Sequence, residues 1–349
     1  MSTDNVAKPL VLYLDMNVWV ELAVGSLRGK QRWEYVRARL QDAVDRGRIT
    51  IPLSGANYLE LWHRSSEESR EDIGKLMRDL SQYKTISSTF EVRRQEVRNY
   101  ISRFFGFDIR KISGIDLVGY GASHAFGSPY GRFRFVESLA SKDGSVKEGS
   151  QVEPPEIWKS LVPEGLKWEW LQLVGTQDVL DNAGVDRTPE HRFGSIYKSE
   201  EIGLRKRLQQ DPKMRSRLKD LVVMQEIQSL LEDINEICGE LERDPHALFL
   251  RQNEGLTLQQ AMHVFVDSLP SSNTWATLRM LKHRDFTHPW DQHDWTDLSF
   301  LSVALPYCDA VITEKRWAHL FKVSGLIKKY KTTVGSRIDD LERILEDTD

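Results

Sequence analysis

The sequence is poor in cysteine, in long apolar runs and in positive charge at its start. Its 349 residues include only two cysteines, Cys238 and Cys308, far apart in the chain. This spacing excludes a disulfide framework and a cysteine-based zinc finger. No apolar run reaches the roughly 18 residues of a membrane-spanning helix, and Asp4 stands where a secretory signal carries positive charge. We therefore expect a cytoplasmic protein.

Neither the net charge nor the glycine pattern identifies a ligand. The formal net charge of −4 argues against a protein that coats nucleic acid indiscriminately. The segment 119–123 lacks the third glycine of a phosphate-binding loop. Basic side chains are nevertheless concentrated in segments 28–48, 198–219 and 315–337. Such stretches are typical of contact with a polyanion, with solvated helix faces as the alternative for each one.

An α/β pattern is present at both ends of the chain. Residues 10–14 and 49–53 are short apolar runs typical of strands buried on both faces. Helical periodicity follows each run, with a break at Gly25-Ser26 in the first case and a cap at Ser54 in the second. The C-terminal part is expected to contain a helix at 294–307, strands at 310–313 and 332–334, and a last helix capped by Ser336. This order predicts parallel strands with right-handed crossovers.

The middle of the chain lacks this alternation, and most of it is expected to be helical. Within 214–243 apolar residues recur at steps of three and four, which predicts a helix paired inside this region, with a dimeric coiled coil as the alternative. The length of 349 residues fits roughly two domains, or one with a large insertion. We predict an α/β fold in which residues 1–64 and 285–349 form one discontinuous domain around a mainly helical insertion, residues 65–284.

Four acidic residues fall at the carboxyl ends of the expected strands or on helices next to them. They are Asp15, Glu60, Asp297 and Glu314. Ligands of an open parallel sheet bind at this edge. Carboxylates that lie close together repel one another unless cations neutralise them, and their oxygens suit Mg²⁺ or Mn²⁺. A pair of such ions supports phosphodiester hydrolysis. Taken singly, each acid is equally explained as a helix cap, a surface residue or a loop residue.

These residues resemble the PIN-domain nucleases. The resemblance is carried by Leu14-Asp15-Met16-Asn17-Val18, by Leu59-Glu60-Leu61, and by Asp297-Leu298 with Thr313-Glu314 sixteen residues after Asp297. Segment 305–309, before the strand at 310–313, is similar to bacterial PIN-like proteins in particular. About a third of the chain is covered, residues 8–64 and 285–349. The resemblance implies a Rossmann-like α/β/α sandwich and metal-dependent cleavage of single-stranded RNA that leaves a 5′-phosphate and a 3′-hydroxyl.

The resemblance also implies roles for individual residues. Asp15, Glu60 and Asp297 would be metal ligands, Asn17 would support them by hydrogen bonding, and Thr313 would orient a water or a ligating carboxylate.

The fourth acid of the family is matched less closely. Glu314 would take its place, although the family usually has Asp, often one position later, where this chain has Lys315. This departure weakens the expectation of a second metal. Asp294 lies one turn before Asp297 on the same helix face and competes for the ligand role, but the spacing to Thr313 favours Asp297.

Histidines and a tryptophan supply the remaining candidates. His283, His288 and His293 lie among acidic residues, and such a cluster can bind Zn²⁺ or Mn²⁺. Their five-residue spacing does not align them on one helix face, and Pro289 predicts a loop, so histidines without a metal are the expected case. Trp295 could stack on a base, although burial is the commoner role of tryptophan.

Together these features predict a divalent-metal-dependent endoribonuclease that acts on single-stranded RNA with Mg²⁺ or Mn²⁺. We expect no membrane contact, and the insertion is the expected surface for a second copy or a regulatory protein. By analogy, similarity to large bacterial PIN-like proteins implies a stress or anti-phage effector. The alternatives are a catalytically silent PIN-like scaffold that binds RNA or a protein, and a DNA nuclease.

Overall fold

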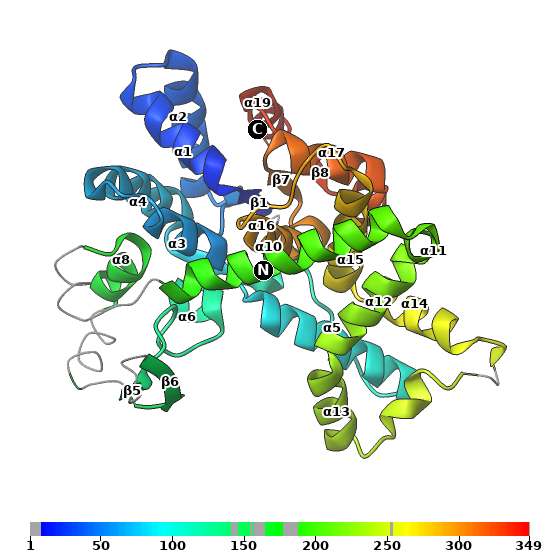
Figure 1. The fold of residues 1–349 in the computed structure, drawn as a ribbon. Coiled ribbons are helices and arrows are strands. Elements are labelled where there is room, and N and C mark those ends of the chain that lie inside the picture. The colour runs from blue at the N-terminus through cyan, green and yellow to red at the C-terminus, as the bar shows by residue number, and fades with distance from the viewer. Residues whose placement is uncertain are drawn as a thin grey trace, which may run out of the picture.

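The computed structural model describes residues 8–140, 146–153, 156, 165–176, 188–251 and 254–348. Its central sheet has four parallel strands in the order β2-β1-β7-β8, so the predicted α/β fold with a parallel sheet is confirmed (Figure 1). The strands are β1 (Leu10–Leu14), β2 (Ile49–Thr50), β7 (Ala310–Ile312) and β8 (Thr333–Gly335). Segments from the two ends of the chain therefore lie side by side in one sheet.

Strand β1 is buried on both faces because its alternate side chains enter two different cores. Leu12 and Leu14 pack with α1 (Met16–Leu27), α2 (Gln31–Asp45), α4 (Glu67–Ser81) and α19 (Ile338–Glu346). Val11 and Tyr13 pack on the other side with α15 (Pro270–Arg284), α16 (Asp294–Tyr307), α17 (Lys315–Ser324) and α18 (Leu326–Tyr330). Figure 1 shows the blue N-terminal helices and the gold and orange C-terminal helices on opposite sides of β1. The sheet is thus the middle of three layers.

The first helix extends further than the sequence predicts. The expected break at Gly25-Ser26 is wrong, since α1 continues to Leu27 and the chain turns at Gly29, which has a φ of 64°. Gly25 is instead a packing position, because a Cβ added there would lie 2.6 Å from Cγ of Trp33. A glycine in a helical pattern can mark a close approach as well as a break.

The middle of the chain contains strands that its sequence does not reveal. They are β3 (Lys84–Ile86), β4 (Val118–Tyr120), β5 (Val136–Ala140) and β6 (Val146–Gln151). β3 pairs with β4 in a separate two-stranded sheet, and a single bridge joins β3 to Leu53, just after the edge strand β2. At this bridge the Leu53 amide donates to the Lys84 carbonyl at 2.9 Å, and the Ile86 amide donates to the Leu53 carbonyl at 2.8 Å. The described part of the middle region is mainly helical, and these short strands are additional elements that the sequence did not indicate. Three-residue strands such as β3 and β4 are too short to show a period-two pattern.

Part of the predicted insertion shares a core with the predicted α/β domain. Ile73 and Leu76 of α4 lie in the same core as Leu12 and Leu14 of β1. This core also receives side chains from α6 (Gly121–Phe126) and α8 (Leu166–Val174). The first segment after residue 64 thus packs directly on the sheet.

A separate helical core lies at the other end of the middle region. The helix predicted over 214–243 is divided into α11 (Pro212–Ser216), α12 (Leu218–Ser229) and α13 (Leu231–Glu240). Its apolar seam packs against Val97 and Ile101 of α5 (Thr89–Phe105), as expected for a helix paired within the chain. Within the described ranges the structure also contains α10 (Thr188–Gln210), α14 (Leu258–Ser268), and the short 3-10 turns η1 (Gly114–Leu117) and η3 (Pro245–Leu248). Among the described helices, none has the length and apolar character needed to cross a membrane.

The C-terminal elements lie close to their predicted bounds. α16 spans Asp294–Tyr307, and β7 and β8 lie within one residue of the expected strands. The cap of the last helix is Arg337 instead of Ser336, a difference of one position. α3 and α16, which carry the predicted acids Glu60 and Asp297, form where the sequence predicts helices. α3 spans Gly55–Trp62, with Ser54 as its N-cap residue.

Candidate metal centre

Three of the four predicted acids converge at the carboxyl end of β1. Asp15 directly follows β1, Glu60 lies on α3, and Asp297 lies in the first turn of α16. One carboxylate oxygen from each lies within 4.8 Å of the other two. We call these residues the acidic triad. Among the described residues, no other group of three His, Cys, Asp or Glu side chains has this arrangement.

Asp15 is fixed by hydrogen bonds from its own strand end and from the neighbouring one. Its backbone amide donates to the Ile312 carbonyl at 3.0 Å, which joins β1 to β7. Its carboxylate accepts from the Met16 amide at 2.8 Å and from Thr313 Oγ1 at 2.5 Å. Burial raises the pKa of Asp15, and these hydrogen bonds oppose the rise. Thr313 therefore holds this carboxylate in one orientation.

Glu60 is the member of the triad with the least support from the protein. The helix that carries it is anchored at its start, where the Ser54 amide donates to Asn57 Oδ1 at 2.8 Å. Glu60 Oε1 is buried and has no hydrogen-bond partner among the described residues. Desolvation raises the pKa of Glu60 well above its usual range, and the charges of Asp15 and Asp297 raise it further. A buried carboxylate oxygen without a donor is unfavourable unless a cation or proton satisfies it.

Asp297 is oriented from the helix after β7. Its Oδ2 accepts a hydrogen bond from Nε1 of the buried Trp317 at 2.8 Å. Desolvation raises the pKa of Asp297 well above its usual range, the charge of Asp15 adds to the rise, and the bond from Trp317 opposes it. The triad is therefore a group of like charges in a poorly hydrated place, which a divalent cation would stabilise.

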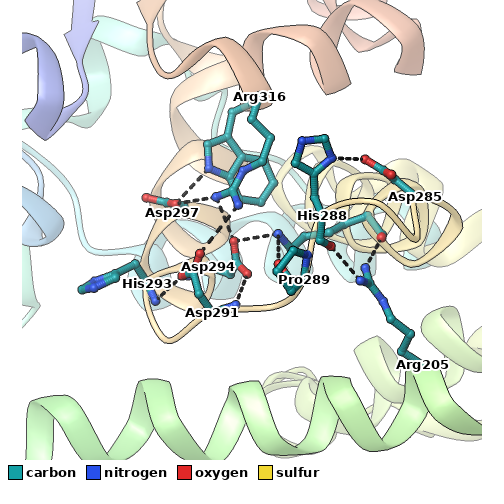
Figure 2. Close-up of polar contacts among 11 residues, drawn as sticks. Arg205, Asp285, His288, Pro289, Asp291, His293, Asp294, Asp297 and Arg316 are labelled. Atoms are coloured by element: carbon teal, nitrogen blue, oxygen red, sulfur yellow. Dashed lines mark hydrogen bonds and ion pairs between the residues drawn. The ribbon is translucent and has the colours of Figure 1, made fainter.

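Asp294, the competitor of Asp297, is engaged elsewhere. Its side chain is 0% exposed, and its Oδ1 lies 2.9 Å from Lys282 Nζ and 2.9 Å from Arg316 Nη2. Its Oδ2 accepts from the Asp291 amide at 2.7 Å. Figure 2 shows this carboxylate surrounded by its donors, one turn away from Asp297. Two cations already neutralise Asp294, so it is a structural charge.

The other predicted site residues differ in their placement. Glu314 is the exposed N-cap residue of α17, and its carboxylate lies outside the triad. Its charge still raises the pKa of Glu60. Lys315, the next residue, is also exposed. Asn17 lies in the first turn of α1, and its buried Oδ1 has no partner among the described residues. A second buried oxygen near Asp15 is thus left for a ligand or a water.

The three histidines lie apart and have different partners. His283 is buried, and its Nε2 lies 2.5 Å from Glu201 Oε2. His288 Nδ1 lies 2.6 Å from Asp285 Oδ2. The exposed His293 precedes α16 and points away from the charged network in Figure 2. The expected loop is present at residues 285–293, which contain no regular element, whereas His283 lies in α15.

Sequence reasoning missed the cations and the indole next to the triad. Arg316, Lys282 and Trp317 come from α17 and α15, and nothing in their spacing distinguishes them from surface residues. The one available signal is that Arg316 follows the strand end by only a few residues. Trp295 lies on the outer face of α16, where its ring stacks on Phe193 of α10 with centroids 6.3 Å apart.

Comparison with known proteins identified no relative of this chain. No family model, no curated protein and no solved structure matches the chain.

Proposed function

We propose that the protein is a divalent-metal-dependent nuclease that hydrolyses phosphodiester bonds of single-stranded RNA. One observation carries the proposal: Asp15, Glu60 and Asp297 converge with ligand atoms within 4.8 Å, while the buried Glu60 Oε1 finds no partner in the described part of the chain. The basic stretches 28–48, 198–219 and 315–337 support a polyanionic substrate. The resemblance to PIN-domain nucleases supports RNA as that substrate.

The residues of the triad fit a hard divalent cation. All three donors are carboxylate oxygens, which Mg²⁺ and Mn²⁺ prefer, and their charges are poorly screened. Asp15, Glu60 and Asp297 would hold the ion. When bound, it supplies Lewis acidity that activates water and offsets the charge of the phosphate.

The protein's own part is to position these ligands. Thr313 orients Asp15 through its hydroxyl, and Trp317 orients Asp297 through its indole N–H. Such partners fix ligand orientation, and their loss typically weakens metal affinity by roughly 10- to 100-fold. Asn17 would complete the polar surroundings through its unpartnered Oδ1. Positioning of this kind lowers the cost of reorganising the site during the reaction.

The decisive assay is cleavage of a labelled single-stranded RNA with Mn²⁺, Mg²⁺ or EDTA. Glu60→Gln is the informative variant because Glu60 Oε1 supports no hydrogen bond in the fold, whereas the Asp15 carboxylate accepts two. Glu232→Gln, an exposed glutamate on α13, is the matched control. We expect metal-dependent cleavage that Glu60→Gln abolishes and Glu232→Gln retains. Single-stranded DNA as a parallel substrate separates a ribonuclease from a DNA nuclease.

A catalytically silent protein is the second candidate, and one observation favours it. The Asp15 carboxylate accepts a hydrogen bond from the Met16 amide at the start of α1, as the side chain of a helix cap does. Asp15 therefore also stabilises the fold. The cap does not account for Glu60. Absence of cleavage with every metal by the folded wild-type protein would favour this second candidate.

A further inference from the structure

The helix after β7 brings a cation to the acidic triad. Arg316 lies in the first turn of α17, two residues after the exposed Glu314. Its Nη2 lies 2.9 Å from Asp294 Oδ1 and 3.6 Å from Asp297 Oδ2, and its Nη1 lies 3.7 Å from Asp291 Oδ2. Figure 2 shows the guanidinium between Asp297 and Asp294. A positive side chain therefore stands beside the triad, while the acid that precedes it on the chain faces solvent.

Arg316 is firmly held and yet keeps most of its donors. Asp294, which is fully buried, fixes it through one hydrogen bond, and Trp317 supports it with a ring centroid 4.8 Å from the guanidinium carbon. The contacts with Asp297 and Asp291 are too long for hydrogen bonds, so Nη1 and the second N–H of Nη2 keep donors for a ligand. Nε is buried and has no partner among the described residues. The side chain is 23% exposed, so part of it reaches solvent. An arginine with free donors at the edge of a metal centre suits a phosphate oxygen.

Arg316 already places a positive charge where a second ion would have to bind. Lys282 is 2% exposed and pairs with Asp294, and Arg316 Nη2 lies 3.6 Å from Asp297 Oδ2. A second divalent ion on that side of Asp297 would lie close to the guanidinium, and like charges repel strongly in a poorly hydrated site.

We propose that Arg316 is a built-in cation that takes the place of a second metal ion and binds a phosphate of the nucleic acid, so that the site contains a single divalent ion. The inference rests on the proposed function and defines how the same site recognises its substrate. The phosphate would be bound on one side by the ion of the triad and on the other by the guanidinium. Arg316 is then a substrate-binding residue, and the triad is the metal ligand set.

The first experiment counts the bound ions. Calorimetric titration of the full chain with Mn²⁺ alone is expected to give one ion per chain for the wild type. Lys315→Gln, which removes the adjacent exposed cation, should behave in the same way. Arg316→Gln should also bind one ion, but roughly threefold or more tightly, because a positive charge near Asp297 is lost. Two ions bound by the wild type would overturn this inference and leave the nuclease proposal standing, whereas no bound ion would overturn the nuclease proposal.

The second experiment measures RNA affinity by fluorescence anisotropy of a labelled single-stranded RNA in Ca²⁺, with intactness of the RNA checked on a gel. Arg316→Gln is expected to weaken binding roughly 10- to 100-fold, the loss of a charge-assisted contact. The RNA affinity of Arg316→Lys should lie between those of the wild type and Arg316→Gln, since lysine keeps the positive charge but lacks the planar guanidinium. The control is Lys75→Gln, which removes an exposed cation on α4 outside the three basic stretches. Its RNA affinity should stay within about twofold of the wild type. Circular dichroism melting verifies that each variant is folded. We expect the Arg316 variants to fold because the buried Asp294 still forms its ion pair with Lys282. Equal RNA affinity of Arg316→Gln and Lys75→Gln would overturn the phosphate-binding role.

Discussion

Two aspartates one helical turn apart on α16 show two ways of placing charge inside a protein. Asp294 is fully buried and is bound by Lys282, Arg316 and a backbone amide. Asp297 accepts one hydrogen bond, from Trp317, has Arg316 Nη2 at 3.6 Å, and lies beside two more carboxylates. The first charge is compensated and stabilises the fold, whereas the second is only partly compensated, at a cost in stability. Partly compensated charge of this kind is a property of functional sites.

The largest effect is expected from removing the compensated charge. Asp294→Asn leaves the buried Lys282 and the adjacent Arg316 without their shared carboxylate. We expect the free energy of unfolding to fall by about 3–5 kcal/mol, the usual cost of breaking a buried ion pair from one side. Urea denaturation of the metal-free protein measures it. A loss below about 1 kcal/mol would contradict the structural role of Asp294.

Removing an uncompensated charge should have the opposite sign. Glu60→Gln takes a like charge out of the triad and leaves an amide at the position of the partnerless Oε1. We expect the metal-free protein to gain about 1–3 kcal/mol in free energy of unfolding. Mn²⁺ at about 100 times its Kd should stabilise the wild type by about 2.7 kcal/mol and this variant hardly at all. Glu232→Gln is the control, and destabilisation by Glu60→Gln would argue against an uncompensated site.

The pH dependence of stability provides a third test. The pKa values of Asp15, Glu60 and Asp297 are raised in the folded protein, chiefly by desolvation. Above the ordinary carboxyl pKa the unfolded chain releases protons that the folded chain retains. The contribution of these three carboxyls to stability is therefore greatest at low pH and falls as pH rises toward their folded pKa values. The slope is up to about 1.4 kcal/mol per pH unit for each such carboxyl.

Denaturation in EDTA from about pH 4 to pH 8 is the measurement, because it spans the ordinary carboxyl pKa and values above it. Glu60→Gln should flatten the decline, and Mn²⁺ should reverse it. Identical profiles for the wild type and Glu60→Gln would show that Glu60 does not retain a proton in the folded protein.

The smallest effect is expected from substituting Glu314. The sequence predicts this acid as a metal ligand, but in the structure it lies outside the triad. Glu314 is exposed and does not belong to the triad. Glu314→Gln should change stability by less than about 0.5 kcal/mol, as most surface substitutions do. Its Mn²⁺ affinity, measured by calorimetry, should stay within about threefold of the wild type, since Glu314 supplies no oxygen to the triad and acts on it only through its charge. A tenfold loss of affinity would return Glu314 to the ligand set.

The strands that could be predicted are those that appear in the sequence as a continuous run of apolar residues. β1 and the strand at 310–313 are apolar on both faces because helices cover both sides of the sheet. β3 has only three residues, and its place at the sheet edge depends on the bridge from Leu53 to Thr85, which no local pattern encodes. Gly25 was misread because a glycine packed against Trp33 looks, in sequence, like a helix break.

The site was predictable where strand ends determine it. Asp15 follows β1 directly, and parallel strands bring their carboxyl ends to one edge. Glu314 also follows a strand, but it caps α17 and faces solvent, while Thr313 before it and Arg316 after it face the triad. The role of Lys282 could not be predicted, because it depends on how α15 packs against α16.

The most direct test of the central claim is anomalous diffraction from crystals soaked in Mn²⁺. We predict one peak within coordination distance of carboxylate oxygens of Asp15, Glu60 and Asp297, and none between Asp297 and Arg316. The peak should be lost in Glu60→Gln crystals and kept in Glu232→Gln crystals. A well-ordered triad without a peak at saturating Mn²⁺ would contradict the account.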